Sequence, residues 1–231
     1  MKELSLSVGE PFTSPAWGSN FVVFATESGE PVPELQTKEY MRRCCKYAKH
    51  YDVWLAPERF ILMGYQCMCI ISPQGNVVGA QKAIHSSPAF RPAGKKSAAL
   101  EVFVTEFGGI ALCVDVDVYR PEFCRIAAAL GAQIVICSQT IRRGDYSTHM
   151  VLTGAWNAAQ LAHIYVVAVT NQFNCVCAPA TLSPLGDGFL SAPNLKLPMT
   201  QRINAERLAD VSPLKPLNRK LYAIHRDELI K

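Results

Sequence analysis

The chain has 231 residues, of which 49% are hydrophobic, and this is enough for a sizeable core in one large domain or two small ones. The formal net charge is only +4, and Lys and Arg are scattered, so no nucleic-acid partner is indicated. The longest apolar runs are too short to span a bilayer, so we expect a soluble protein without a membrane partner.

The sequence contains nine cysteines, an odd number, and several of them lie inside apolar runs. A secreted disulfide framework normally has an even number of cysteines behind a signal peptide, and no signal-peptide pattern is visible. Reduced thiols and a cytoplasmic location are therefore expected.

In the first half of the chain, short β-branched runs alternate with one helical pattern and are followed by two hairpins. The expected strands are Leu4 to Val8, Phe21 to Phe24, Val53 to Leu55, Tyr65 to Ser72, Val77 to Gln81, Ala98 to Thr105 and Ile110 to Val114, with a helix from Lys38 to His50. The turn residues PQGN and EFGG join the two hairpins.

The second half continues with alternating helices and strands. We expect helices from Pro121 to Leu130 and from about Met150 to His163, and strands at Ile134 to Cys137, Tyr165 to Val169 and Ala180 to Leu182. Beyond Pro193 the prolines predict an arm with a short strand, Arg207 to Val211, and a terminal helix. Buried strands separated by helices indicate an α/β or α+β fold.

One stretch carries a resemblance to a known family. Residues 108–122 read GGIALCVDVDVYRPE, and residues 131–135 follow the next helix as GAQIV. They resemble the central phrase of the carbon-nitrogen hydrolase (nitrilase) superfamily, Gly-x-Ile-Gly-x-x-Ile-Cys-Tyr-Asp-x-x-Phe-Pro-Glu followed by Gly-Ala-Asp. Three further phrases resemble family segments in the right order: NVVGAQKAIH (76–85), AAQLAHIYVVAVTNQ (158–172) and LSPLGD (182–187).

The resemblance implies an α-β-β-α sandwich of two mixed sheets with helices outside. It implies one domain over residues 1–231, with a shortened N-terminal strand-helix unit and a C-terminal arm at 193–231. Members bind small amide- or nitrile-like ligands without a cofactor or metal, and they commonly form homodimers or larger homo-oligomers.

In the family a cysteine thiolate attacks the substrate carbon, a glutamate acts as base and a lysine stabilises the intermediate. The ungapped alignment places Asp115 at the cysteine position, while Lys82 matches the lysine. The base position falls on Thr26 in strict register and on Glu27 with a one-residue bulge. Asp117 matches the aspartate that follows the cysteine, whose role is local structure.

The departures predict a non-catalytic homologue that binds a ligand or partner, with Asp115 and Lys82 paired across the old pocket. No acidic residue lies between His85 and Gly94, where the second glutamate of the family normally stands. Cys113 and Cys124 are interpreted as core thiols.

Two other interpretations remain open. The first is an active amidase-type hydrolase in which Asp115 activates water, with Lys82 and Glu27 in supporting roles. The second is a metal site of Asp115, Asp117 and either His85 or His149, but no His-x-x-x-His or Cys-x-x-Cys spacing is present, so no metal is expected.

Overall fold

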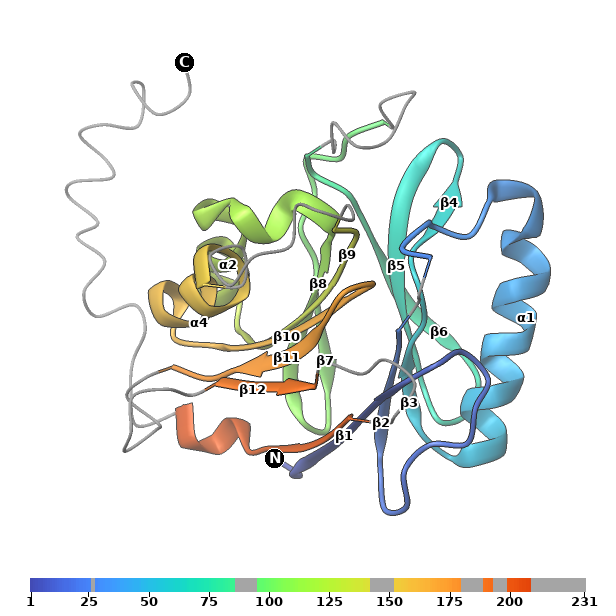
Figure 1. Ribbon diagram of the computed structural model, residues 1–231, viewed down its shortest axis with the longest axis horizontal. Coiled ribbons are helices and arrows are strands. Elements are labelled where there is room, and N and C mark those ends of the chain that lie inside the picture. The colour runs from blue at the N-terminus through green and yellow to red at the C-terminus, as the bar shows by residue number, and fades with distance from the viewer. Residues whose placement is uncertain (26–27, 86–94, 142–151, 180–188, 193–198, 209–231) are drawn as a thin grey trace.

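The computed structural model describes residues 1–25, 28–85, 95–141, 152–179, 189–192 and 199–208, and its elements are numbered as in Figure 1. One sheet has the strand order β13-β1-β2-β3-β5-β4, with β6 paired to β5. Its strands are β1 (Leu4–Gly9), β2 (Phe21–Phe24), β3 (Trp54–Ala56), β4 (Phe60–Leu62), β5 (Tyr65–Ile71), β6 (Val77–Lys82) and β13 (Met199–Ile203).

The other sheet has the order β12-β11-β10-β9-β8-β7. Its strands are β7 (Val102–Thr105), β8 (Gly108–Val114), β9 (Ala132–Gln139), β10 (Tyr165–Thr170), β11 (Asn174–Cys177) and β12 (Phe189–Ala192). Both sheets are mixed: β8, β9 and β10 run parallel, for example, while β7 and β11 are antiparallel to their neighbours.

The two sheets lie face to face between helix α1 (Glu34–Tyr51) on one side and helices α2 (Pro121–Ala129) and α4 (Asn157–Ala162) on the other (Figure 1). Side chains from both sheets form the central core, among them Leu6, Met68, Ile110, Leu112 and Val167. The predicted α-β-β-α sandwich of two mixed sheets is therefore confirmed.

Strand β8 shows how sequence period places side chains in these layers. Ile110, Leu112 and Val114 point into the core between the sheets, whereas Ala111 and Cys113 point toward the helices. Alternate residues of a strand face opposite sides, and both faces here are apolar because both are covered. The strand therefore reads as one continuous apolar run.

The C-terminal part of the prediction needs correction. The strand expected at Arg207 to Val211 is wrong over its described residues, because Ala205–Leu208 forms a 3₁₀ helix, η4. The strand of this region is β13, which lies earlier in the chain. Ala205 and Leu208 are both buried against the core between the sheets. A spacing of three between buried residues is that of a helical turn.

The long helix expected from Met150 is divided in the structure. A π-helical turn, η2 (Leu152–Trp156), precedes α4, and both pack on the outer side of the second sheet. The strand expected at Ala180 to Leu182 lies outside the described residues. In the part of the chain that is described, no helix is long and apolar enough to cross a membrane.

All nine cysteines are among the described residues, and all are free thiols. They lie in the two outer layers, between each sheet and its helices. Cys113, Cys124, Cys137, Cys175 and Cys177 are in the layer with α2 and α4, and Cys44, Cys45, Cys67 and Cys69 are in the layer with α1. Burial raises the pKa of Cys44 and of Cys124 to about 12. Because the thiolate is the reactive form, these thiols are inert in the folded protein.

We therefore expect the native protein to react with a thiol reagent such as DTNB at Cys45 alone, the one cysteine that is not fully buried. All nine should react after unfolding in denaturant. Counting modified thiols by intact mass checks this. Rapid labelling of Cys113 in the folded protein would contradict its placement under α2.

Candidate functional site

The candidate site lies where β8 ends and the chain turns into the 3₁₀ helix η1 (Asp115–Tyr119). Asp115, the first residue after the strand, has φ of 54°. This left-handed conformation is uncommon for a residue with a side chain, although Asp tolerates it better than most. Asp115 is buried, with only 2% of its surface exposed. Such conformations concentrate at functional positions, so the turn is a candidate site on geometry as well as on sequence.

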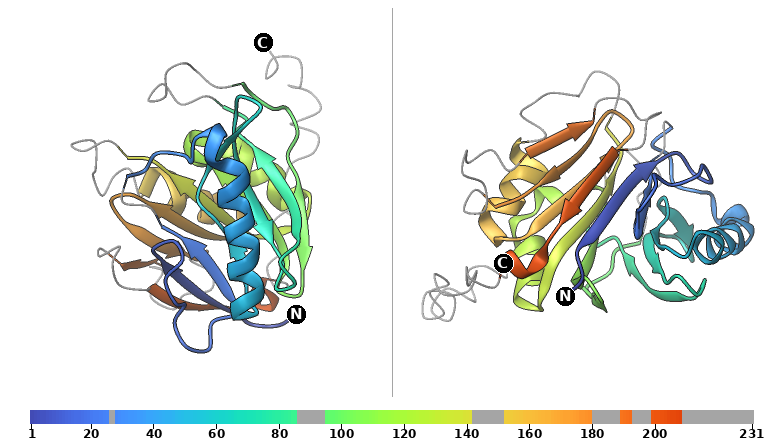
Figure 2. Two further views of the ribbon diagram at one scale, coloured as in Figure 1. Left: turned by 90° about the vertical axis from the view of Figure 1, so that its right-hand side faces the viewer. Right: turned by 90° about the horizontal axis from the view of Figure 1, so that it is seen from below.

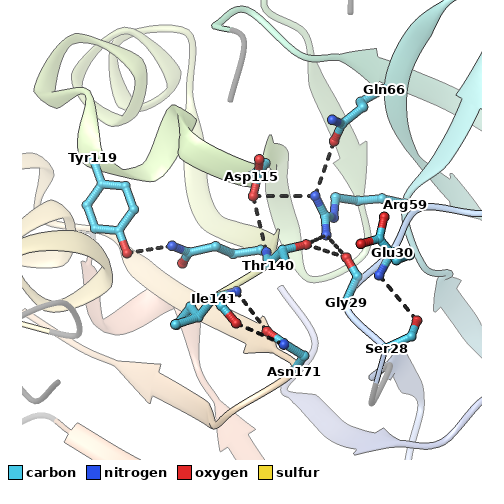
Figure 3. Close-up of polar contacts among 11 residues, drawn as sticks. Ser28, Gly29, Glu30, Arg59, Gln66, Asp115, Tyr119, Thr140, Ile141 and Asn171 are labelled. Carbon is cyan, nitrogen blue, oxygen red and sulfur yellow. Dashed lines mark hydrogen bonds and ion pairs between the residues drawn. The ribbon is translucent and has the colours of Figure 1, made fainter. Parts of the chain in front are cut away.

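The partner of Asp115 is a buried arginine. Asp115 Oδ1 lies 3.4 Å from Arg59 Nη1 and accepts the backbone N–H of Thr140 at 3.1 Å. Arg59 Nη1 also donates to Gln66 Oε1 at 3.1 Å, and Nη2 donates to the Gly29 carbonyl at 2.6 Å and to the Thr140 hydroxyl (Figure 3). Arg59 precedes β4 and Gln66 lies in β5 of the first sheet, whereas Asp115 follows β8 and Thr140 follows β9 of the second, so this network joins the two sheets.

The charges of this pair are almost completely removed from water, since the side chains of Arg59 and Asp115 are 1% and 3% exposed. Burial lowers the pKa of the Arg59 guanidinium, and the negative charge of Asp115 opposes that shift. Asp115 Oδ2 is buried and has no hydrogen-bond partner among the described residues. One acceptor of the carboxyl group therefore has no donor in the described part of the chain.

Gly29 is required on the opposite side of the network. Its φ is +69°, and a Cβ atom there would lie 2.9 Å from Thr140 Cγ2. Its carbonyl accepts hydrogen bonds from both Arg59 and the Thr140 hydroxyl. A side chain at this position would push the carbonyl away, so the close approach depends on glycine.

The residues after β9 are held from a second direction. Asn171 Oδ1 accepts the backbone N–H of Ile141 at 2.7 Å, and Asn171 Nδ2 donates to the Ile141 carbonyl at 2.9 Å. Gln139 Nε2 donates to the hydroxyl of Tyr119. These bonds fix the backbone on either side of Thr140, and Figure 3 shows Tyr119 and Asn171 on different sides of it.

Asp117 has a different role from Asp115. It is fully buried and accepts the backbone N–H groups of Ile84 and His85 at 3.0 and 2.8 Å, and its Oδ1 lies 2.8 Å from His85 Nδ1. Burial raises the pKa of Asp117, and these donors oppose the shift. Asp117 thus joins η1 to the segment that follows β6, which agrees with the structural role expected from the sequence.

The other predicted site residues are not brought to Asp115 in the described part of the structure. Lys82 ends β6 with an exposed side chain, and its Nζ lies 4.6 Å from the centroid of the Tyr65 ring. Thr26 and Glu27 lie outside the described residues. The cation that meets Asp115 is Arg59, and among the described interactions none joins Lys82 to it.

The alternatives for cysteine and metal can also be placed. Cys113 of β8 and Cys124 of α2 are both buried in the layer between the second sheet and its helices, as expected of core thiols, and burial raises the pKa of both. Within the described ranges, no group of three or more His, Cys, Asp or Glu side chains could hold a metal ion. His149 lies outside those ranges.

Sequence reasoning did not find Arg59, Gln66 or Thr140. Nothing next to Arg59 in the sequence distinguishes it from a surface arginine, because its partners lie 30 residues away at Gly29 and 81 residues away at Thr140. A buried arginine whose hydrogen-bond partners are distant in sequence leaves no local pattern.

Known proteins resemble this chain in fold but not in sequence. No protein-family model matches the chain, and no curated protein matches it. A carbon-nitrogen hydrolase from Helicobacter pylori G27 superposes with a TM-score of 0.77 at 16% identity, over 99% of this chain and 98% of that one. Nit3 of Saccharomyces cerevisiae, a member of branch 10 of the nitrilase superfamily, has a TM-score of 0.74 at 13% identity, over 94% and 95%.

A third similar structure is a mutant of the amidase from Nesterenkonia sp. AN1 in complex with butyramide. Its TM-score is 0.70 at 14% identity, covering 90% of this chain and 93% of that one. The structural neighbours are thus members of the carbon-nitrogen hydrolase, or nitrilase, superfamily, and this chain has the nitrilase-like sandwich fold over nearly its whole length.

We expect Arg59→Met to destabilise the protein by about 3–5 kcal/mol, because it leaves the Asp115 carboxylate buried without its cation. The double variant Arg59→Met/Asp115→Leu should lose clearly less than the sum of the two single variants. Urea unfolding of the four proteins measures this coupling.

Arg42→Met is the matched control, because Arg42 is paired with Glu39 at 2.7 Å on the exposed surface of α1. It should leave the unfolding midpoint nearly unchanged. Additive effects of Arg59→Met and Asp115→Leu would show that the two charges do not depend on each other.

Proposed function

We propose that this chain is a nitrilase-superfamily protein that lacks the Cys-dependent hydrolysis of the family and acts by binding a small ligand or a partner. The observation that carries the proposal is the state of Asp115. It stands at the position that the sequence resemblance assigns to the nucleophilic cysteine, and a buried arginine holds its Oδ1.

The chemistry of Asp115 argues against hydrolysis by the family's covalent route. Attack by a carboxylate on an amide would form an acyl anhydride, which is a higher-energy intermediate than the thioester formed by a cysteine. The ion pair with Arg59 further stabilises the carboxylate before any reaction. The lysine that the alignment assigns to the oxyanion, Lys82, has an exposed side chain beside Tyr65.

Asp115 Oδ2, which has no donor among the residues that the structure describes, supports a binding role. A buried acceptor without a donor is unfavourable by about 1–3 kcal/mol, so a molecule that donates an N–H to Oδ2 would recover this energy. Because Arg59 already balances the charge of Asp115, the favoured ligand is neutral. A small primary amide has such an N–H, and a protein with a similar fold binds butyramide.

A second candidate is an amidase-type hydrolase in which Asp115 removes a proton from water, assisted by Lys82 and Glu27. The observation that favours it is that the buried Oδ2 has no donor within the described ranges, because that oxygen could accept the proton. General-base catalysis contributes about 10²–10⁴-fold, which is a small part of what amide cleavage requires. For either candidate function, the proposal includes the homo-oligomeric state and the cytoplasmic location expected from the sequence.

The purified protein should release no ammonia above background from a panel of small aliphatic amides, because it has no thiol at the position of attack. Ammonia release measured with a coupled glutamate dehydrogenase assay checks this. Activity that disappears in Asp115→Asn would contradict the proposal and support the second candidate.

Butyramide should raise the midpoint of thermal unfolding of the native protein, and Asp115→Asn should reduce this shift because the substitution removes the charged acceptor. Asp52→Asn is the control: Asp52 is an exposed aspartate at the end of α1 and also has a left-handed backbone, with φ of 53°. It should keep the full shift. If butyramide produced no shift in the native protein, the amide-binding part of the proposal would be wrong.

A further inference from the structure

The outer face of β1 and β13 is not covered by a helix in the described structure. Strands β1 and β2 are parallel, yet residues 10–20 between them contain no helix. Helix α1 packs on β3, β4 and β5, toward the other end of the sheet. The right-hand view of Figure 2 shows β1 and β13 side by side, away from α1.

The side chains on this face are polar. In β1, Leu4, Leu6 and Val8 point into the core, so Ser5 and Ser7 point outward. In the register of β1 with β13, Ser5 lies opposite Arg202 and Ser7 opposite Thr200, which places these four polar side chains on one face. Ser7 is buried, with 1% of its surface exposed, and accepts the backbone N–H of Ala16. The open part of this face is therefore at Ser5, Thr200 and Arg202, and its polar side chains are suited to water or to a polar ligand.

A pocket of about 420 Å³ lies on this face, lined by Ser5, Trp17, Ser19, Thr200, Gln201 and Arg202. This volume is within the range of small-molecule sites, about 300–1,000 Å³. The Trp17 side chain is fully exposed at the edge of the pocket. Its indole ring is therefore accessible to a planar group that enters the pocket.

The positive charge at the pocket is also accessible. The Arg202 side chain is 78% exposed, and its Nη1 lies 3.7 Å from Glu3 Oε2, beyond the distance of a direct hydrogen bond. The guanidinium can therefore turn toward an anion in the pocket. Ser5, Ser19 and Thr200 add hydroxyl groups, which both donate and accept hydrogen bonds.

We propose that this pocket binds a nucleoside monophosphate, with the base stacked on Trp17 and the phosphate held by Arg202. An exposed indole provides a stacking surface for a planar base, and the planar guanidinium matches a phosphate group. The hydroxyl groups between these two residues are suited to the sugar. The site is separate from Asp115 and does not depend on the function proposed for it.

Isothermal titration calorimetry with AMP tests the proposal, because its signal does not rely on tryptophan. The native protein should bind AMP saturably. Trp17→Ala should weaken binding of AMP by at least about tenfold, the effect of losing one stacked base. Arg202→Gln should weaken binding of AMP while changing binding of adenosine little.

Leu35→Ala is the matched control, because Leu35 is as exposed as Trp17 but lies on α1, outside this pocket. It should bind AMP like the native protein, and all three variants should keep the native unfolding midpoint. Failure of the native protein to bind AMP would overturn the proposal. Binding of AMP by Trp17→Ala and Arg202→Gln as tightly as by the native protein would also overturn it. An oligomer that dissociates on Trp17→Ala would also overturn it, because a second copy would then cover the pocket.

Discussion

The polar network at the candidate site depends on one buried ion pair, between Arg59, just before β4, and Asp115, at the start of η1. Removing each charge from water is unfavourable by several kcal/mol, so the pair is stable only where further polar groups surround it. Gln66, Gly29 and Thr140 provide those groups for the guanidinium. The left-handed backbone of Asp115 and the glycine at position 29 are both consequences of bringing these groups together.

The layers of the fold are largely independent of this pair. The apolar residues of β8 alternate between the central core and the helix layer, and the same division places every cysteine away from the space between the sheets. Such packing requires only hydrophobic residues of suitable size at each position. The sandwich can therefore be retained while the polar residues at the end of β8 change, which is why the fold alone does not define an activity.

The N-terminal strands β1 and β2 are joined without the usual helix. A parallel pair is usually connected by a helix that covers one face of the sheet, and that helix is missing between β1 and β2. The alternation of leucine and serine in β1 makes the outer face polar, and the backbone N–H of Ala16 donates to the Ser7 hydroxyl at 3.3 Å. The segment between β1 and β2 thus covers Ser7, which is only 1% exposed, in place of a helix.

The sequence by itself determined the elements around the candidate site and their order. The alternation in β8, the proline at the start of α2 and the order of the family-like phrases predict the sandwich and identify Asp115. These signals are local, because strand period and helix capping depend on residues a few positions apart. Position 82 marks the limit of such signals: Gln81 is buried and Lys82 exposed, and a slip of one residue would exchange them.

Only the tertiary structure decided which cation lies beside Asp115 and which strand pairs with β1 at the edge of the first sheet. Arg59 reaches Gly29, Gln66 and Thr140 from separate parts of the sequence, and β13 pairs with β1 although they lie near opposite ends of the chain. A buried charge interacts with the groups that the fold places beside it, however far apart they are in the sequence. Their partners become known only when the two sheets are packed together.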